Sequence, residues 1–374
     1  MSVERISKLK MRPSVAVVIK DTFTEFFISD IRRSVVLQMQ KEVANKIRQL
    51  DGKKTVAEWM DVNDIGKDQE SDVFSVLTYL NEHYILINED APYGNGYMKF
   101  KRVYSLLENF FSSQSEVEKV FCKVRESRVM IIGLGSVGTW VALSLQMAGV
   151  KKFILVDNDR VKLSNLHRQS GFFESDLNSL KTEALQRRMQ ALSSDVEITS
   201  INDWFDEDFF KRHVPGEVNL MINCADKPTV DITSEIIGEY CMEKNITHII
   251  GGGYNTHQTL VGQVVIPGQT ACVECFRKNL EELNDIDTTK VRKLDIKNRK
   301  VGSFPPLSAL SSSVTANEAF KVLAGLKNLV MTNNRTEFHL SDLNFENRVM
   351  KRRQDCKWCG YEGKYYQLPR YQDK

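Results

Sequence analysis

The stretch SRVMIIGLGSVGTWVALSLQMAGVKKFILVDND, residues 127–159, decides the fold class of this chain. Its apolar run at 129–132 predicts a strand that is buried on both faces of a parallel sheet. Gly133, Gly135 and Gly138 follow at once as G-x-G-x-x-G, which predicts a tight turn where a phosphate can approach the backbone. The stretch therefore predicts an α/β, Rossmann-like nucleotide-binding unit.

A helix and a second strand complete this unit. An apolar face recurs at helical spacing after the glycines, and the second strand covers 153–156. Asp157 stands at the tip of this strand, where an acidic side chain can hold ribose hydroxyls. A P-loop is excluded, because Thr139 follows Gly138 where a phosphate-binding lysine would stand. On these residues alone, a dinucleotide dehydrogenase stays open.

The composition is that of a globular chain with little net charge. Of 374 residues, 42% are hydrophobic, enough for the cores of two or three domains. A formal charge of +2, from 51 basic and 49 acidic residues, gives no global indication of a nucleic-acid or membrane partner. No apolar run is long enough to span a membrane and the N-terminus lacks the apolar core of a signal peptide, which predicts a cytoplasmic protein.

Residues 1–90 predict a separate, small α+β domain of the winged-helix type. Segments 14–19, 25–28 and 34–39 are rich in Val, Ile and Phe and predict a three-stranded meander, followed by three short helices. Small helical modules can bind DNA, but the third helix, SDVFSVLTYLNEHY, has no Lys or Arg to contact phosphates. We therefore expect no nucleic-acid partner. Residues 91–126 combine turn residues with a mixed-charge helical stretch and predict a linker.

The run RQLDGKKTVAEWM at 48–60, with its flanking segments, resembles the precursor-recognition domains related to the pyrroloquinoline-quinone maturation chaperone. Those domains bind leader peptides of ribosomally made precursors, so the resemblance implies a peptide partner. An open sheet edge at 34–39 predicts that the leader adds as a strand there, against the helix at 71–84. The alternative is a winged-helix domain that only supports a dimer.

The nucleotide unit continues with D-x-D at 157–159, SNLxRQ at 164–169, Lys181, and Asp226 after a strand. This order resembles the E1-like, ThiF-type adenylating enzymes that activate ubiquitin-like proteins and sulfur carriers, and it predicts an adenylation domain over residues 127–374. The resemblance implies ATP and Mg²⁺ as cofactors. By matching position, it implies nucleotide contacts from Gly133, Gly135, Gly138, Asp157, Asp159, Asn165 and Gln169, phosphate contacts from Arg168 and Lys181, and a Mg²⁺ contact from Asp226.

These residue types suit adenylation on chemical grounds. A carboxylate that attacks the α-phosphate of ATP brings two anions together, so cations and a metal must neutralise the growing charge. Arg168 offers a planar fork, Lys181 a point charge and Asp226 a ligand for Mg²⁺. A dehydrogenase has no use for this set, which favours ATP over NAD. Taken singly, each residue would fit a surface ion pair.

Two pairs, Cys272-Val-Glu-Cys275 and Cys356-Lys-Trp-Cys359, predict a tetrahedral Cys₄ zinc site, with a redox pair as the alternative. Four protein thiolates leave no open position, so the zinc is predicted to be structural. The basic run KVRKLDIKNRK at 290–300 predicts either a contact for phosphates or an acidic peptide, or a solvated loop.

The remaining cysteines bear on the reaction type. Activators of ubiquitin-like proteins commonly use a Cys in a crossover region, but residues 276–313 contain none. Cys224 and Cys241 lie in apolar contexts that predict buried, inert thiols. The chain therefore resembles the enzymes that mature ribosomal peptide antibiotics such as microcin C7 and pantocin A.

This resemblance implies a homodimer that adenylates a carboxylate of a ribosomal precursor peptide, followed by intramolecular condensation. AMP transfer to the peptide C-terminus, activation of a ubiquitin-like or sulfur-carrier protein, and a non-catalytic peptide-binding scaffold are the alternatives. Partner subunits in this family often supply an arginine to the site, and Arg102 is the candidate here.

Overall fold

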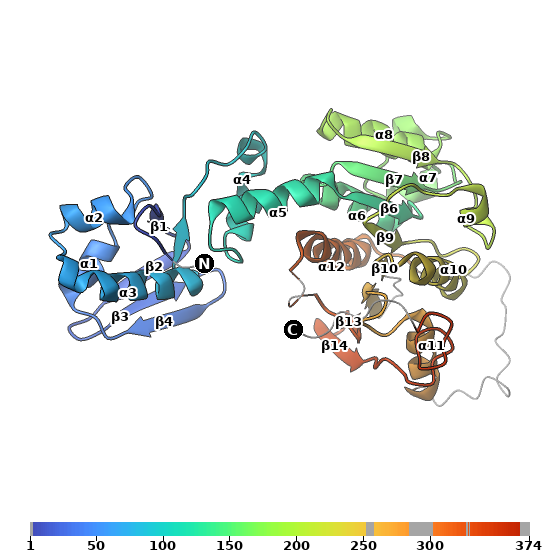
Figure 1. Cartoon of the computed structure of the whole chain (residues 1–374). Coiled ribbons are helices and arrows are strands. Elements are labelled where there is room, and N and C mark those ends of the chain that lie inside the picture. The colour runs from blue at the N-terminus through green and yellow to red at the C-terminus, as the bar shows by residue number, and fades with distance from the viewer. Residues whose placement is uncertain (1–2, 252–257, 284–301, 327, 329, 367–374) are drawn as a thin grey trace. The chain divides into compact units, whose positions relative to one another are not determined.

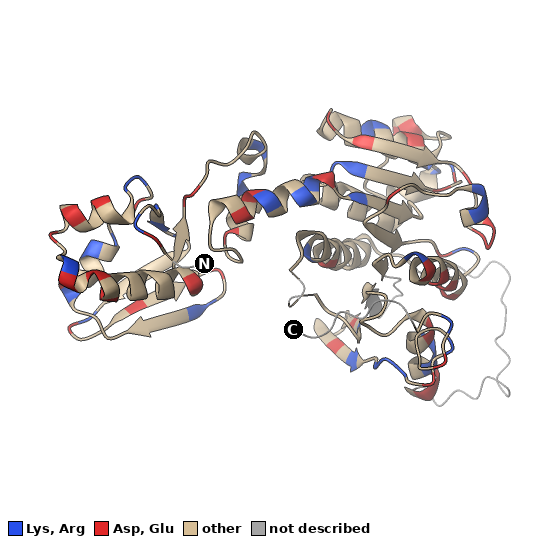
Figure 2. Cartoon of the chain, viewed as in Figure 1, with Lys and Arg blue, Asp and Glu red and all other residues tan. Residues whose placement is uncertain are grey.

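The computed structural model describes residues 3–251, 258–283, 302–326, 328 and 330–366 (Figure 1). Contacts divide the chain into two compact units, Met1–Cys122 and Lys123–Lys374, each with its own hydrophobic core. Acidic and basic residues are interspersed in both units (Figure 2). No helix in the described ranges is long and apolar enough to cross a membrane. The basic run at 290–300 lies outside the described residues.

The first unit contains the predicted three-stranded meander, with antiparallel strands in the order β2-β3-β4. A second, two-stranded sheet pairs β1 with β5, which the sequence pattern did not predict. The elements of this unit are β1 (Leu9–Met11), β2 (Val15–Ile19), β3 (Thr24–Ile28), β4 (Arg33–Leu37), α1 (Lys41–Ile47), α2 (Val56–Val62), the 3₁₀ turn η1 (Lys67–Gln69), α3 (Glu70–Glu82), β5 (Leu86–Asn88), α4 (Tyr97–Leu107) and α5 (Gln114–Glu126), the last extending past the boundary.

The motif that supports the resemblance to peptide-recognition domains has a local structural role. Gly52 adopts a positive φ of 79° in a turn. The Thr55 hydroxyl accepts from the backbone N–H of Glu58, whose carboxylate accepts from the Thr55 N–H, so the two residues form a capping box at the start of α2. Turn and helix capping therefore account for this motif, and the winged-helix class and the peptide partner stay predictions.

The segment at 91–126, for which we predicted a linker, contains α4 and α5 and contributes to a packed cluster. The Tyr104 ring contacts Tyr93 and Phe121, at ring centroid distances of 4.7 and 4.3 Å. The buried Arg12 guanidinium donates to the carbonyl oxygens of Leu86 and Phe111, at 3.0 and 2.7 Å. Residues up to 122 therefore belong to the compact first unit.

The second unit is an α/β fold around a six-stranded sheet in the order β12-β10-β9-β6-β7-β8, parallel except for β12. A three-stranded antiparallel sheet, β11-β13-β14, accompanies it. The elements are β6 (Arg128–Ile132), α6 (Ser136–Met147), β7 (Lys152–Val156), α7 (Leu163–Leu166), the 3₁₀ turn η2 (Glu174–Asp176), α8 (Lys181–Leu192), β8 (Glu197–Ile201), α9 (Phe209–Arg212), β9 (Leu220–Asn223), α10 (Val230–Lys244), β10 (His248–Ile250), β11 (Gln258–Val261), β12 (Gln263–Val265), α11 (Val273–Leu283), α12 (Pro305–Ala324), β13 (Asn334–His339) and β14 (Asn344–Val349).

The sheet order places a ligand crevice between β6 and β9. The first strand along the chain in this sheet, β6, lies in its middle, so the connections leave it in opposite directions. Open α/β sheets bind ligands outside the carboxyl ends of the strands at such a reversal. The predicted Rossmann-like topology is confirmed.

The three glycines after β6 serve different structural purposes. Gly133 has a φ of 89°, and a Cβ there would lie 2.6 Å from the backbone nitrogen of Ala225. A Cβ on Gly138 would lie 1.9 Å from the carbonyl oxygen of Gly133, so this glycine lets α6 approach the turn. A Cβ on Gly135 would meet no atom within 4 Å, which leaves open space above the turn.

We expect Gly138→Ala to lower the thermal unfolding midpoint, because its methyl group would overlap the Gly133 carbonyl oxygen. Overpacking of this kind costs about 1–3 kcal/mol. Gly135→Ala is the matched control and should shift the midpoint much less, since its Cβ meets open space. Differential scanning calorimetry of both variants gives the comparison, and an unchanged midpoint for Gly138→Ala would contradict the close approach.

Candidate active site

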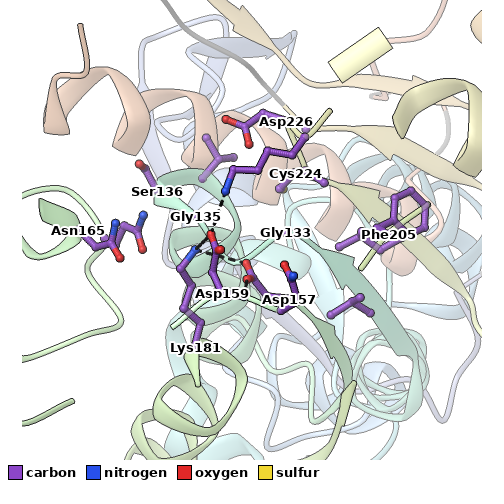
Figure 3. A pocket seen from close by; sticks show the side chains of 18 of the residues that line it. Gly133, Gly135, Ser136, Asp157, Asp159, Asn165, Lys181, Phe205, Cys224 and Asp226 are labelled. Carbon is purple, nitrogen blue, oxygen red and sulfur yellow. Dashed lines mark hydrogen bonds and ion pairs between the residues drawn. The ribbon is translucent and has the colours of Figure 1, made fainter. Parts of the chain in front are cut away.

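A cavity of about 600 Å³ opens at the carboxyl ends of β6, β7 and β9 (Figure 3). Nine of the ten residues that we predicted for the nucleotide site line it. They are Gly133, Gly135, Asp157, Asp159, Asn165, Arg168, Gln169, Lys181 and Asp226. The tenth, Gly138, lies in α6 and packs against the turn instead of facing the cavity.

The Asp157 carboxylate fixes the glycine turn from the end of β7. Its Oδ2 accepts from the backbone N–H of Leu134 and its Oδ1 from that of Asp159, both at 2.7 Å. The side chain is 9% exposed, so little water competes for these bonds. Each carboxylate oxygen has a second acceptor position. Asp157 can therefore hold the turn and still accept from a hydroxyl of a ligand.

Lys181 is a buried cation at the first residue of α8. Its Nζ lies 3.1 Å from Asp159 Oδ2 and 3.6 Å from Asp157 Oδ2 (Figure 3). A second cation, Lys227, lies 3.4 Å from the same oxygen of Asp159. Burial opposes ionisation of Asp159, but the two lysines outweigh it and lower the pKa of this carboxyl group. Asp159 is therefore ionised at neutral pH between two ammonium groups.

The SNLxRQ segment forms α7 and the turn after it. The Asn165 side-chain oxygen accepts from the backbone N–H of Lys162 at 2.9 Å, which places the segment at the cavity wall. Arg168 is half-buried and donates to the carbonyl oxygen of Ser164 at 2.5 Å. Gln169 is 4% exposed, and its Oε1 has no hydrogen-bond partner among the described residues. A buried acceptor without a partner costs about 1–3 kcal/mol, so Gln169 fits a ligand donor.

Asp226 follows β9 on the opposite wall. The Asn223 side chain accepts from the N–H of Ala225 and donates to the hydroxyl of Thr233, which anchors the loop to α10. The Asp226 side chain is exposed, and no ion-pair partner is found for it in the described part of the chain. Carboxylate oxygens are the ligands that Mg²⁺ prefers. The cavity thus combines an open glycine turn, an unpaired buried acceptor, cations and a carboxylate, a set that fits ATP with Mg²⁺.

Sequence reasoning missed other residues of this cavity, among them Lys227 and Trp204. Trp204 is 54% exposed and lies shortly after the end of β8, and Lys227 follows Asp226 after β9. Their common signal is a position just beyond the carboxyl end of a parallel strand, where side chains meet at one sheet edge. Arg102, by contrast, is an exposed residue of α4 in the first unit.

A family model described as the ThiF family matches residues 112–359, two thirds of the chain. The chain belongs to the ThiF family. It is therefore an ATP-dependent adenylating enzyme with an E1-like adenylation domain.

Individual ThiF relatives agree with this assignment. The chain is 28% identical over 208 residues to the sulfur carrier protein ThiS adenylyltransferase of Escherichia coli (strain K12), over 55% of this chain and 75% of that protein. The structure is similar to that of E. coli MccB with ATP, with a TM-score of 0.73 at 20% identity, over 94% of this chain and 99% of MccB. It is also similar to the microcin C7 biosynthetic enzyme MccB in complex with N-formylated MccA, with a TM-score of 0.70 at 20% identity and the same coverage. At such identities, the similarity to MccB establishes the fold.

One cysteine, Cys224, is among the described residues that line this ThiF-family site, and Cys241, the next cysteine along the chain, lies in the core on α10. Cys224 lines the cavity, but its Sγ packs so closely against Gly251 that a Cβ there would lie 2.7 Å away. Burial raises the pKa of Cys224 to about 12 and that of Cys241 well above its usual value. Thiolates are the nucleophilic form of cysteine, and at pH 7 a pKa near 12 leaves about one thiol in 10⁵ ionised. The predicted burial is confirmed for Cys241, whereas Cys224 is half-buried, and the inertness of both thiols stays a prediction.

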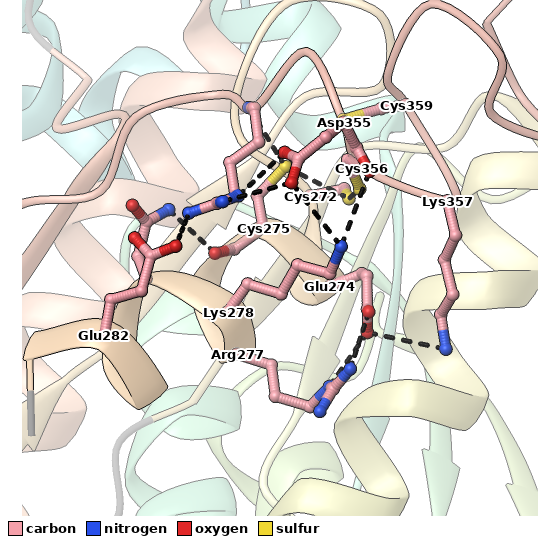
Figure 4. A network of polar contacts seen from close by, with 12 residues as sticks. Cys272, Glu274, Cys275, Arg277, Lys278, Glu282, Asp355, Cys356, Lys357 and Cys359 are labelled. Atoms are coloured by element: carbon pink, nitrogen blue, oxygen red, sulfur yellow. Dashed lines mark hydrogen bonds and ion pairs between the residues drawn. The ribbon is translucent and has the colours of Figure 1, made fainter. Parts of the chain in front are cut away.

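The four cysteines of the C-x-x-C pairs converge in the structure (Figure 4). The Sγ atoms of Cys272 and Cys356 are 3.5 Å apart, those of Cys275 and Cys359 are 3.4 Å apart, and all four lie within 4.8 Å of one another. Tetrahedral Zn–S bonds of about 2.3 Å place sulfur atoms about 3.8 Å apart. The backbone N–H of Arg353 points to the Cys275 sulfur at 3.4 Å. The buried cluster therefore fits a closed tetrahedral metal site.

The residues between the cysteines add an ionic link to the same cluster (Figure 4). Glu274 is 2% exposed, and Arg277 donates to both of its oxygens at 2.9 and 2.6 Å. Lys357, which stands between the other two cysteines, lies 3.7 Å from Glu274 Oε2. Opposite charges thus join the two pairs independently of the thiols.

Proposed function

We propose that this chain uses ATP and Mg²⁺ to adenylate a carboxylate of a ribosomally made precursor peptide, as a homodimer. The observation that carries this proposal is the cavity itself, where Arg168, Lys181 and Asp226 face one volume beside an open glycine turn. Similarity to MccB structures that contain ATP or the peptide MccA supports a peptide as the substrate.

The proposed roles follow from the positions of the side chains. A peptide carboxylate oxygen attacks the α-phosphorus of ATP, an acyl-phosphate bond forms, and pyrophosphate leaves. Lys181, held between Asp157 and Asp159, presents a fixed positive charge to the phosphates, and Arg168 offers a second. Asp226 and Asp159 are the carboxylates that would hold Mg²⁺, which neutralises phosphate charge when bound.

The acyl-adenylate is proposed to react within the peptide. Cys224 is the cysteine among the described residues that line the cavity, and burial raises its pKa, which disfavours a thioester step. A nucleophile of the peptide can instead attack the acyl carbon, which releases AMP and a proton and leaves the peptide one water lighter. We therefore favour intramolecular condensation.

Two alternatives to this proposal have supporting observations. The similarity to a microcin C7 biosynthetic enzyme favours transfer of AMP to the peptide, which would make the product heavier by one adenylyl group. The identity of 28% to a ThiS adenylyltransferase favours a sulfur-carrier protein as the substrate. Mass spectrometry of a candidate precursor peptide, after incubation with enzyme, ATP and Mg²⁺, separates loss of water from gain of an adenylyl group, and an unchanged mass would favour the sulfur-carrier alternative.

We expect Asp226→Ala and Arg168→Ala to lower kcat/KM for precursor-dependent pyrophosphate release by at least about 10²-fold, as for loss of other electrostatic groups. Both side chains face the cavity and neither belongs to the core, so the unfolding midpoint should stay near that of the wild type. Asp208→Ala, an exposed aspartate outside the cavity, is the matched control. Wild-type turnover by both variants would overturn the assignment of the site.

The first unit is proposed to bind the leader of this precursor. In the order β2-β3-β4, β4 lies at an edge of its sheet, and an edge strand offers backbone donors and acceptors to an extended peptide. Val35, opposite Phe26, is 7% exposed and faces the core, whereas Val36 is 56% exposed. The exposed Arg33 lies on the same strand. Leader recognition is therefore expected along β4.

Val36→Asp should weaken binding of a fluorescent synthetic leader about tenfold, which corresponds to about 1.4 kcal/mol. The added charge would lie beside the incoming strand without entering the core. Val18→Asp is the control, because Val18 is 42% exposed on β2, at the other edge of the same sheet. Fluorescence anisotropy measures both, and a loss confined to Val18→Asp would place the leader elsewhere.

The Cys₄ cluster is proposed to hold one structural zinc ion. All four cysteines are buried, and none of them is among the described residues that line the cavity. Cys356→Ser should remove zinc, measured by elemental mass spectrometry, and lower the unfolding midpoint, because metal binding energy contributes to folding. Cys122→Ser and Cys224→Ser should keep both zinc and activity. A zinc-free wild-type protein of unchanged stability would refute the proposal.

A further inference from the structure

Lys227 connects two walls of the cavity. It stands in the loop between β9 and α10, and its Nζ lies 3.4 Å from Asp159 Oδ2, in the loop after β7. α10 begins three residues later at Val230, which also lines the cavity, so the positive end of this 15-residue helix points to the same volume. Lys227 is therefore placed where the loops after β7 and β9 meet at the cavity.

The bond of Lys227 to Asp159 is weak and easily exchanged. The Lys227 side chain is 59% exposed, and exposed ion pairs contribute about 0–1 kcal/mol. Asp159 has a closer and better buried partner in Lys181, at 3.1 Å and 6% exposed. If Lys227 leaves, Asp159 keeps a counter-charge. The Asp159 carboxylate therefore stays paired with Lys181 if Lys227 binds another anion.

The net charge of the cavity lining depends on Lys227. Among the described lining residues, four are acidic and four are basic, so the lining is neutral as it stands. Without Lys227 it would carry a net negative charge, which opposes the entry of a polyphosphate. The other cations differ in position: Lys181 is buried against two aspartates, whereas Lys227 is near solvent. A leaving pyrophosphate must depart toward solvent and would meet Lys227.

We propose that Lys227 is a phosphate-binding residue that exchanges Asp159 for the β- and γ-phosphates of ATP and then for pyrophosphate. In this exchange the Lys227 ammonium group moves from Asp159 to the phosphates. The Asp159 oxygen that it leaves can then bind another cation. This inference rests on the ATP site of the proposed function and adds a residue that the G-x-G-x-x-G, SNLxRQ and strand-aspartate pattern does not include.

Isothermal titration calorimetry of the full-length protein with ATP, pyrophosphate and AMP, without peptide, tests the role. Lys227→Met should weaken ATP and pyrophosphate binding about tenfold and AMP binding less than about twofold, because AMP lacks the two outer phosphates. Lys227→Arg should restore most of the affinity for ATP. Lys244→Met is the matched control, since Lys244 pairs with Glu243 at the other end of α10 and does not line the cavity.

Three other results would contradict the inference or the proposed function. Equal affinities of wild type and Lys227→Met for ATP and pyrophosphate would show that Lys227 is only a surface ion-pair partner and would overturn the inference. An equal loss for ATP and AMP, with a lower unfolding midpoint, would assign it a structural role and also overturn it. Failure of the wild type itself to bind ATP would instead refute the ATP site of the proposed function.

Discussion

The carboxylate of Asp157 ties together the segments on which the site depends. It accepts backbone hydrogen bonds from Leu134 in the glycine turn and from Asp159 in its own loop, and it lies near the ammonium group of Lys181 in α8. Three stretches of chain, from 134 to 181, thus meet at one buried group. Because two of these bonds are to the backbone, the geometry is set before a ligand arrives, which is the condition for electrostatic catalysis without reorganisation.

Much of the site could be predicted because parallel strands bring their carboxyl ends to one sheet edge. Residues that follow the strands at 128–132, 152–156 and 220–223 are far apart in sequence, yet the topology alone places them together. Lys227 and Trp204 escaped prediction because neither belongs to the G-x-G-x-x-G, D-x-D, SNLxRQ or strand-aspartate pattern, and only the folded structure shows that they line the cavity. The spacing of the glycines did not show that the third packs α6 against the turn while the other two line the cavity.

The first unit also contains features that the sequence pattern did not predict. The meander and helices follow from local patterns of apolar residues, and these were predicted correctly. The pairing of β1 with β5 joins Leu9 to Asn88, and each strand is three residues long. Such short strands carry almost no alternation, so their pairing depends on tertiary contacts. The aromatic packing around Tyr104 has the same origin, because its partners come from both sides of the turn between α4 and α5.

The two halves of the cysteine cluster lie 84 residues apart in the chain, from Cys272 to Cys356, and the intervening sequence includes α11, α12 and two strands of the smaller sheet. During synthesis, the first pair emerges long before the second, so the tetrahedral set cannot close until the strands between them have been made. Until then Glu274 also lacks Lys357. A nascent chain that ends before Cys356 therefore holds only the Cys272–Cys275 pair, and its Glu274 has Arg277 but not Lys357 as a cationic partner. The four-thiol site is complete only once the chain has been synthesised through Cys359.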